Sequence, residues 1–125
     1  MTIYFADSRI GESGDGLTWN TAFAFLEEAL GAAQEDGDEI WCKWCVFNRN
    51  CGYNILKSGV SLYGGFPRHL QQTNGNKYFR PYRTVIDGGG AYRGLIMRTG
   101  SLIDRFEIRN CTADYGAGIL IYTPT

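Results

Sequence analysis

Several features are scarce in this chain, and each scarcity excludes a class of protein. Among its 125 residues are three prolines and one histidine, and no apolar run approaches the 18 residues of a membrane-spanning helix. Lys and Arg number 12 against 13 Asp and Glu. The chain therefore lacks the basic excess typical of nucleic-acid-binding proteins. We expect no membrane span and no nucleic-acid partner.

The N-terminus also lacks the features of a signal peptide. Residues 1–7 contain neither a basic start nor a long apolar stretch. The sequence is thus compatible with a protein that stays inside the cell, in the cytoplasm or in a virion, or with one whose signal segment has been removed.

Glycine, in contrast, is abundant. Seventeen glycines are nearly double the usual share of ~7%. They separate short runs rich in β-branched and aromatic residues, so a flexible linker and a collagen-like repeat are excluded. With 44% hydrophobic residues, the chain is expected to fold as one domain.

One helical pattern lies near the N-terminus. Thr18 or Asn20 can cap its start, and Gly37 can end it. The pattern predicts an amphipathic helix of about four turns whose apolar side covers another element. Its apolar residues recur at helical spacing: Ala22, Phe25, Leu26, Ala29, Leu30 and Ala33.

Beyond residue 38, short β-rich runs recur at near-regular intervals. Runs that begin at Ile40, Val60, Thr84 and Phe106 start 20, 24 and 22 residues apart. Such a period, with Gly or Asn at the corners, predicts a solenoid of stacked parallel strands. A second series interleaves with the first: 53–57, 94–98 and 118–122.

Alternation along each strand assigns the side chains to two faces. We expect two inward columns, formed by Cys42, Leu62, Ile86 and Ile108, and by Ile40, Val60, Thr84 and Phe106. We expect two outward columns, formed by Trp41, Ser61, Val85 and Glu107, and by Lys43, Tyr63, Asp87 and Arg109.

Five segments occur in a fixed order: Ile3-Tyr4-Phe5, Gly14–Trp19, Gly37–Trp41, Leu56–Phe66 and Thr84–Gly89. In this order they resemble the N-terminal part of right-handed parallel β-helix proteins of the pectin-lyase-like class, especially large bacterial surface proteins. The resemblance implies an all-β solenoid, a short right-handed parallel β-helix of about four coils with an N-terminal capping α-helix. Residues 1–37 would form the first strand, loop and cap, and residues 38–125 the coils of one domain or of a piece of a longer solenoid.

The resemblance implies a non-enzymatic structural or binding module of a secreted or cell-surface protein, with glycans as candidate ligands. Two alternatives stay open: a carbohydrate-active enzyme, either lyase or hydrolase, and a phage virion tail or decoration protein. For an enzyme, the candidate catalytic residues are Asp87, Glu107 and Arg109, since lyases of this fold place acids for Ca²⁺ beside a basic residue. The plainer interpretation is a cross-strand ion pair. We expect no cofactor, with Ca²⁺ as the alternative.

Aromatic side chains are the candidates for glycan contact. Trp41 and Tyr63 are expected to point outward, and Tyr78 and Tyr82 lie in an aromatic and basic loop. Trp19 precedes the expected helix and is interpreted as its anchor.

Two further motifs have competing interpretations. Cys42 and Cys45 form a CxxC motif, but positions i and i+3 of a strand face opposite sides, which favours packing over a metal or redox site. A disulfide between Cys45 and Cys51 stays open, and the structure of residues 42–54 is left unassigned. Gly14-Asp15-Gly16 is interpreted as a turn in which Asp15 binds nearby backbone, rather than as part of a calcium loop.

The last β-rich run carries an expectation about partners. Ile119, Leu120 and Ile121 would lie in the final coil with nothing to cover them. Exposed apolar ends and free strand edges favour pairing. We therefore expect self-association through this coil, most simply as a two-fold dimer, or contact with further coils of a longer chain.

Overall fold

The computed structural model describes residues 1–48, 55–112 and 118–122, with the backbone alone for residues 120–122. The described chain is 34% strand and 6% helix, so the fold is mostly β with one short helix. Its elements in chain order are β1 (Ile3–Ala6), α1 (Leu26–Ala32), β2 (Glu39–Lys43), β3 (Val46–Asn48), β4 (Ile55–Leu56), β5 (Ser61–Phe66), β6 (Thr84–Asp87), β7 (Leu95–Arg98), β8 (Leu102–Asp104), β9 (Phe106–Arg109) and β10 (Ile119–Tyr122).

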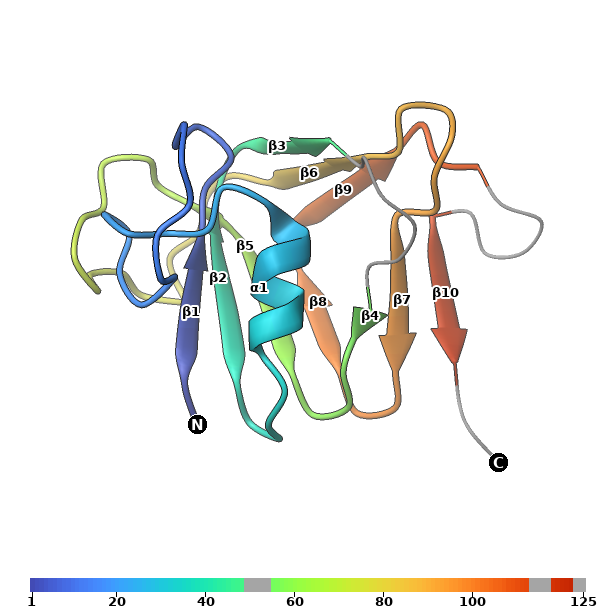
Figure 1. Ribbon diagram of the computed structural model, residues 1–125, viewed down its shortest axis with the longest axis horizontal. Coiled ribbons are helices and arrows are strands. Elements are labelled where there is room, and N and C mark those ends of the chain that lie inside the picture. The colour runs from blue at the N-terminus through green and yellow to red at the C-terminus, as the bar shows by residue number, and fades with distance from the viewer. Residues whose placement is uncertain (49–54, 113–117, 123–125) are drawn as a thin grey trace.

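The strands form three parallel sheets. The first has the order β1-β2-β5-β8, the second β3-β6-β9, and the third β4-β7-β10. Figure 1 shows the first and third sheets upright, with the second crossing above them and α1 in front of the first sheet. Within the described residues, no helix is long and apolar enough to cross a membrane.

The expected fold class, a right-handed parallel β-helix solenoid of about four coils, is wrong. Across the described residues, the strands belong to separate short parallel sheets, and no closure of these sheets into a solenoid is detected. Part of the sequence period instead reflects strand pairing inside a sheet. Val85 pairs with Glu107 in the second sheet, for example, and Leu95 with Ile119 in the third.

The expected columns of stacked side chains are correct where their residues lie in the second sheet. They are wrong where they combine residues of the first and second sheets. Ile86 lies between Phe47 and Ile108, and Asp87 is opposite Arg109, as expected. Leu62, however, lies in the first sheet. There it pairs with Ile40 and with Ile103 of β8, a strand that the sequence pattern does not reveal.

The helix is shorter than expected. α1 spans seven residues, and Phe25, at its N-cap, is 50% exposed. The helix does not begin earlier because Phe23 makes backbone hydrogen bonds with β1 and with Asp7, the residue that follows it. Its N–H donates to the Phe5 carbonyl at 2.9 Å, and its carbonyl accepts the Asp7 N–H at 2.9 Å. The chain at Phe23 therefore pairs with the edge of β1 instead of extending the helix.

The buried side chains form two clusters. The larger one joins Leu26 and Leu30 of α1 to Ile40, Leu62 and Ile86 of the sheets. The smaller one is aromatic and lies on the other face of the first sheet. Its rings are close: Phe5–Trp19 4.7 Å, Trp19–Phe66 5.5 Å and Trp41–Phe66 4.7 Å between centroids.

Candidate functional site

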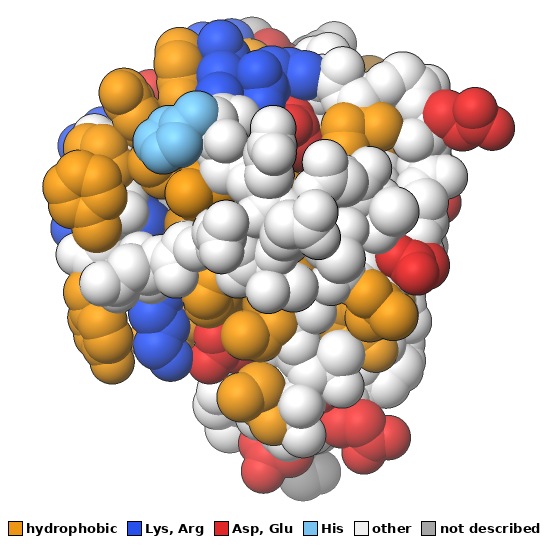
Figure 2. Space-filling view, turned by 90° about the vertical axis from the view of Figure 1, so that its left-hand side faces the viewer, with side chains coloured by type: hydrophobic (Ala, Val, Ile, Leu, Met, Phe, Trp, Pro, Cys, Tyr) orange, Lys and Arg blue, Asp and Glu red, His pale blue; other side chains and the backbone are white. Residues whose placement is uncertain are grey.

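A long connection, residues 67–83, joins β5 to β6 and covers the aromatic cluster; we call it the 67–83 loop. Connections of this length without regular structure are often functional. In Figure 2, which shows this side of the molecule, hydrophobic side chains lie beside Lys, Arg and the histidine, His69. This combination makes the loop the candidate binding surface.

Lys43 holds the first part of the 67–83 loop from beneath. Its ammonium group donates hydrogen bonds to the carbonyl oxygens of Arg68 at 3.0 Å and Leu70 at 2.7 Å, and lies 3.9 Å from the Asp7 carboxylate. Lys43 is 6% exposed, and burial lowers its pKa. Arg9 donates two hydrogen bonds to Asp7, at 3.1 and 2.9 Å. Each buried charge is thus paired, as a low-dielectric interior requires.

Trp19 and Arg80 hold the rest of the loop. The Trp19 indole N–H donates to the Asn74 carbonyl at 2.7 Å. The Arg80 side chain is 7% exposed, donates to the Gly64 carbonyl at 3.2 Å, and pairs with Asp104 at 2.7 Å. The expectation that Trp19 anchors a helix therefore needs correction, because its hydrogen bond goes to this loop.

Three aromatic side chains project from this fixed loop into solvent. Tyr78 is 87% exposed, Phe79 64% and Tyr82 44%. Tyr82 stacks on the Trp44 ring at 4.9 Å, and the Arg68 guanidinium carbon lies 3.4 Å from the centroid of the same ring. The surface therefore combines exposed aromatic faces with a stacked cationic side chain.

The other two aromatic candidates lie deeper. Trp41 was expected outward, but it is 8% exposed, because Phe66 and Leu70 cover that face of the first sheet. Tyr63 is half-buried beneath basic side chains, with Lys77 Nζ 5.4 Å and the Arg80 guanidinium carbon 4.9 Å from its ring centroid. The structure thus brings Tyr78 and Tyr82 to the surface and removes Trp41 from it.

Charge is segregated along the chain around this surface. Between Ile40 and Ile86 the sequence has seven Lys and Arg and no Asp or Glu. From Ile10 through Glu39 it has eight Asp and Glu and no Lys or Arg. In Figure 2 the blue side chains lie mainly at the top and left, and the red ones mainly at the right and the bottom. The candidate surface therefore belongs to the basic part of a nearly neutral chain.

The candidate catalytic residues lie together but form an ordinary turn and ion-pair arrangement. Arg109 is 3.4 Å from Asp87 and 3.4 Å from Glu107. The hydrogen bond from the Gly89 N–H, at 2.8 Å, followed by those from Asn110 and Arg109, lowers the pKa of Asp87. A general acid or base needs a pKa near the working pH. Asp87 is thus held ionised, which suits a turn-capping role.

The remaining acids have structural partners. Asp15 accepts hydrogen bonds from the Leu17 N–H at 3.0 Å and the Thr21 hydroxyl at 2.7 Å, and these bonds lower its pKa. This confirms the turn interpretation. Asp38 accepts from the Thr2 and Glu35 N–H groups. In the described part of the chain, no group of three His, Cys, Asp or Glu residues could hold a metal ion.

The CxxC cysteines are buried. Cys42 is 0% and Cys45 4% exposed, and both are free. Burial raises the pKa of each thiol, which opposes thiolate chemistry. Both side chains pack in the larger core cluster, so the packing interpretation is confirmed. The alternative of a Cys45–Cys51 disulfide involves Cys51, which lies outside the described residues.

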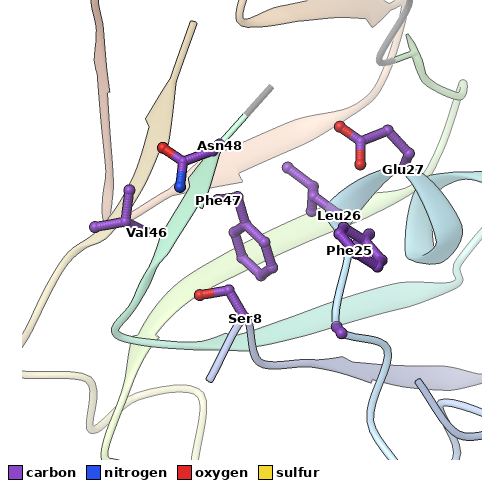
Figure 3. Close-up of a pocket in the computed structure, with 8 residues that line it drawn as sticks. Ser8, Phe25, Leu26, Glu27, Val46, Phe47 and Asn48 are labelled. Carbon is purple, nitrogen blue, oxygen red and sulfur yellow. The ribbon is translucent and has the colours of Figure 1, made fainter. Parts of the chain in front are cut away.

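A small hollow lies between the start of α1 and β3 (Figure 3). Its volume is about 210 Å³, below the range of about 300–1,000 Å³ typical of small-molecule sites. Figure 3 shows Phe47 and Leu26 on facing sides of it, with Val46 and Glu27 at the rim. The residues around it are mixed: the hydroxyl of Ser8, the carboxylate of Glu27 and the amide of Asn48 lie among apolar side chains.

Sequence reasoning missed two features of the candidate surface. One is the buried Lys43–Asp7 pair beneath it, which borders a hollow of about 330 Å³ together with His69. The other is Phe79, which the sequence analysis did not select among the aromatic candidates. The absence of acids between residues 40 and 86 is a signal that could have marked this region as basic.

Comparison with known proteins adds no relative. No family model matches the chain, and no curated protein or solved structure matches it either. The pectin-lyase-like resemblance is therefore supported by the sequence motifs alone.

Proposed function

We propose that this chain is a non-enzymatic binding module that contacts glycans through the exposed aromatic side chains of the 67–83 loop. The observation that carries the proposal is the exposure of Tyr78 and Phe79, 87% and 64%, on a loop held from beneath by Lys43, Trp19 and Arg80. Aromatic faces stack on the apolar faces of sugar rings. A loop that is already ordered loses little conformational entropy on binding.

Removal of the exposed rings tests this proposal. Tyr78→Ala and Phe79→Ala are each expected to weaken glycan binding about tenfold, which corresponds to ~1.4 kcal/mol. Phe25→Ala is the matched control, because Phe25 is also half-exposed but lies at the start of α1. The measurement is a glycan array followed by titration calorimetry on the best ligand. Binding that survives both loop substitutions would contradict the proposal.

A turnover assay tests the non-enzymatic part. The carboxylate of Asp87 is held ionised by its turn, and its partner Arg109 already neutralises charge there. We expect no new reducing ends and no unsaturated products when the purified chain is incubated with pectin, alginate and similar polymers. Turnover by the wild type that disappears in Asp87→Asn or Arg109→Ala would contradict this proposal and indicate that the chain is an enzyme.

We also propose that the chain associates with itself at the end of the fold that carries β10. β10 is the edge strand of the third sheet among the described residues, and Ile119 is 37% exposed. The side chains of Leu120 and Ile121, which the sequence analysis also implicated, lie outside the described residues. Light scattering of the wild type and of Ile119→Lys measures the association, and a wild type that stays monomeric at high concentration would contradict it.

A further inference from the structure

We infer that β9 of one chain pairs with β9 of a second copy, antiparallel and around a two-fold axis at Ile108. The inference rests on the proposed self-association and names a different strand, a register and the residues that cross the interface. It follows from three properties of β9: the direction of its backbone groups, its apolar side chains and its charge pattern.

The backbone of β9 has one free side. β9 is the outer strand of the second sheet among the described residues. The Thr84 N–H donates to the Arg105 carbonyl at 3.0 Å, and the Gly88 N–H to the Arg109 carbonyl at 2.9 Å. Because backbone groups alternate in direction along a strand, those of Phe106 and Ile108 face away from β6. Such an edge is a template for another strand.

The end of the fold at β9 is also apolar and open. Phe106 and Ile108 pack against the larger core cluster but are only partly buried. Leu102 on the neighbouring strand β8 is 42% exposed. At the opposite end, by contrast, Phe23 bridges to β1 and α1 packs on β1 and β4. One end of the sheets is therefore covered, and the other leaves apolar side chains in contact with water.

The charge pattern of β9 is complementary to itself. In an antiparallel pair centred on Ile108, Glu107 of each copy lies opposite Arg109 of the other. Both side chains are about half-exposed, 46% for Glu107 and 48% for Arg109. Arg109 lies 3.4 Å from Glu107 and from Asp87 of its own chain, so the contacts across the axis form by exchange of these exposed ion pairs. Opposite charges directly across an antiparallel pair are stabilising and like charges are destabilising. The charge pattern is thus complementary to a second copy of the same strand, which favours a second copy as the partner.

Charge reversal provides a sharp test of this register. Glu107→Arg places Arg opposite Arg109 in the dimer, and Arg109→Glu places Glu opposite Glu107. We expect each variant alone to weaken dimerisation at least tenfold, as measured by light scattering and sedimentation velocity. An equimolar mixture of the two variants should form a heterodimer, because every pair across the axis is then opposite in charge. Glu12→Arg, an exposed reversal far from β9 in the sequence, is the control and should dimerise like the wild type.

The possible outcomes separate this inference from the broader proposal. A wild-type monomer overturns both. A second outcome is a wild-type dimer that still forms in both charge-reversal variants but dissociates in Ile119→Lys. This outcome would support self-association at the end that carries β10 and would overturn the β9 pairing. A second measurement needs no substitution: salt from roughly 0.05 to 1 M should weaken the wild-type dimer, because exposed ion pairs cross the axis. A dimer insensitive to salt would count against the inference even if the variants failed to fold.

Discussion

The ammonium nitrogen of Lys43 lies 2.7 Å from the carbonyl oxygen of Leu70, which joins β2 to the 67–83 loop. A second bond to Arg68 at 3.0 Å fixes the same turn of the loop. A single buried side chain therefore holds the first part of the loop from which Tyr78 and Phe79 project.

Lys43→Met is expected to destabilise the fold by about 1–3 kcal/mol, because two carbonyl groups lose their hydrogen-bond donor and Asp7 loses a nearby cation. Urea denaturation gives the free energy of unfolding, and hydrogen exchange should show faster exchange in the loop. Lys57→Met is the matched control and should change stability by less than about 0.5 kcal/mol. Equal effects of the two substitutions would rule out the anchoring role.

Ile86→Ala is expected to cost about 2–5 kcal/mol, through the lost transfer free energy and the cavity that remains. Ile86 is 0% exposed and lies between Phe47 and Ile108 in the second sheet. Leu17→Ala removes a side chain that is 48% exposed and should cost much less. Thermal and urea unfolding of the two variants provide the comparison, and a loss below about 1 kcal/mol at Ile86 would be inconsistent with this packing.

Gly65→Ala is expected to destabilise the chain by more than about 2 kcal/mol. Gly65 has a φ of +80°, and a Cβ there would meet the carbonyl oxygen of Tyr82. The left-handed backbone alone costs a non-glycine residue roughly 1–2 kcal/mol. Gly11→Ala is the control, since a Cβ at Gly11 would meet nothing within 4 Å. The melting temperatures of the two variants measure these effects. An unchanged melting temperature for Gly65→Ala would contradict the described turn.

Acid should remove the contribution of Asp104 to stability. Its hydrogen bond from Arg80 lowers its pKa below the ordinary value of 3.8. The folded state therefore binds this proton less readily than the unfolded state. The contribution of Asp104 to the free energy of unfolding is fully present above about pH 3.8, the pKa in the unfolded state. It is lost as the pH falls through the lower pKa of the folded state. The carboxylate is 39% exposed, so solvent screening limits the effect to less than about 1 kcal/mol.

Asp104→Asn provides the check on this acid dependence. Unfolding free energies of the wild type and the variant should differ at neutral pH and converge as the pH falls toward about 2. A difference that stays constant with pH would mean that the carboxylate charge has no role in the Arg80 contact.

Local sequence patterns predicted the pairing of β6 with β9 and of β7 with β10. The 22-residue interval placed Asp87 opposite Arg109, and the 24-residue interval placed Leu95 beside Ile119. The same intervals misplaced Leu62, because residues 60–64 belong to a different sheet from residues 84–88, and hydrophobic alternation is identical in both. Periodicity identifies strands, whereas the assignment of a strand to a sheet depends on contacts distant in sequence.

The candidate site was less predictable for the same reason. Nothing near Trp41 in the sequence indicates that Phe66 and Leu70 cover it, so alternation alone placed it at the surface. The helix was overestimated because Ala22 and Phe25 fit helical spacing. The structure instead pairs the backbone of Phe23 with β1.

Acidic side chains are concentrated in residues 10–39 and basic ones in residues 40–86, and on the face in Figure 2 they lie mainly on different sides, so we expect the nearly neutral molecule to have an electric dipole. A dipole turns a molecule during its approach to a charged surface before any contact forms. An anionic polymer would therefore meet the basic side of the molecule first, which is the side that carries Tyr78 and Phe79. Association should then be faster at low ionic strength, and the chain should adsorb to both cation and anion exchangers despite its net charge of −1.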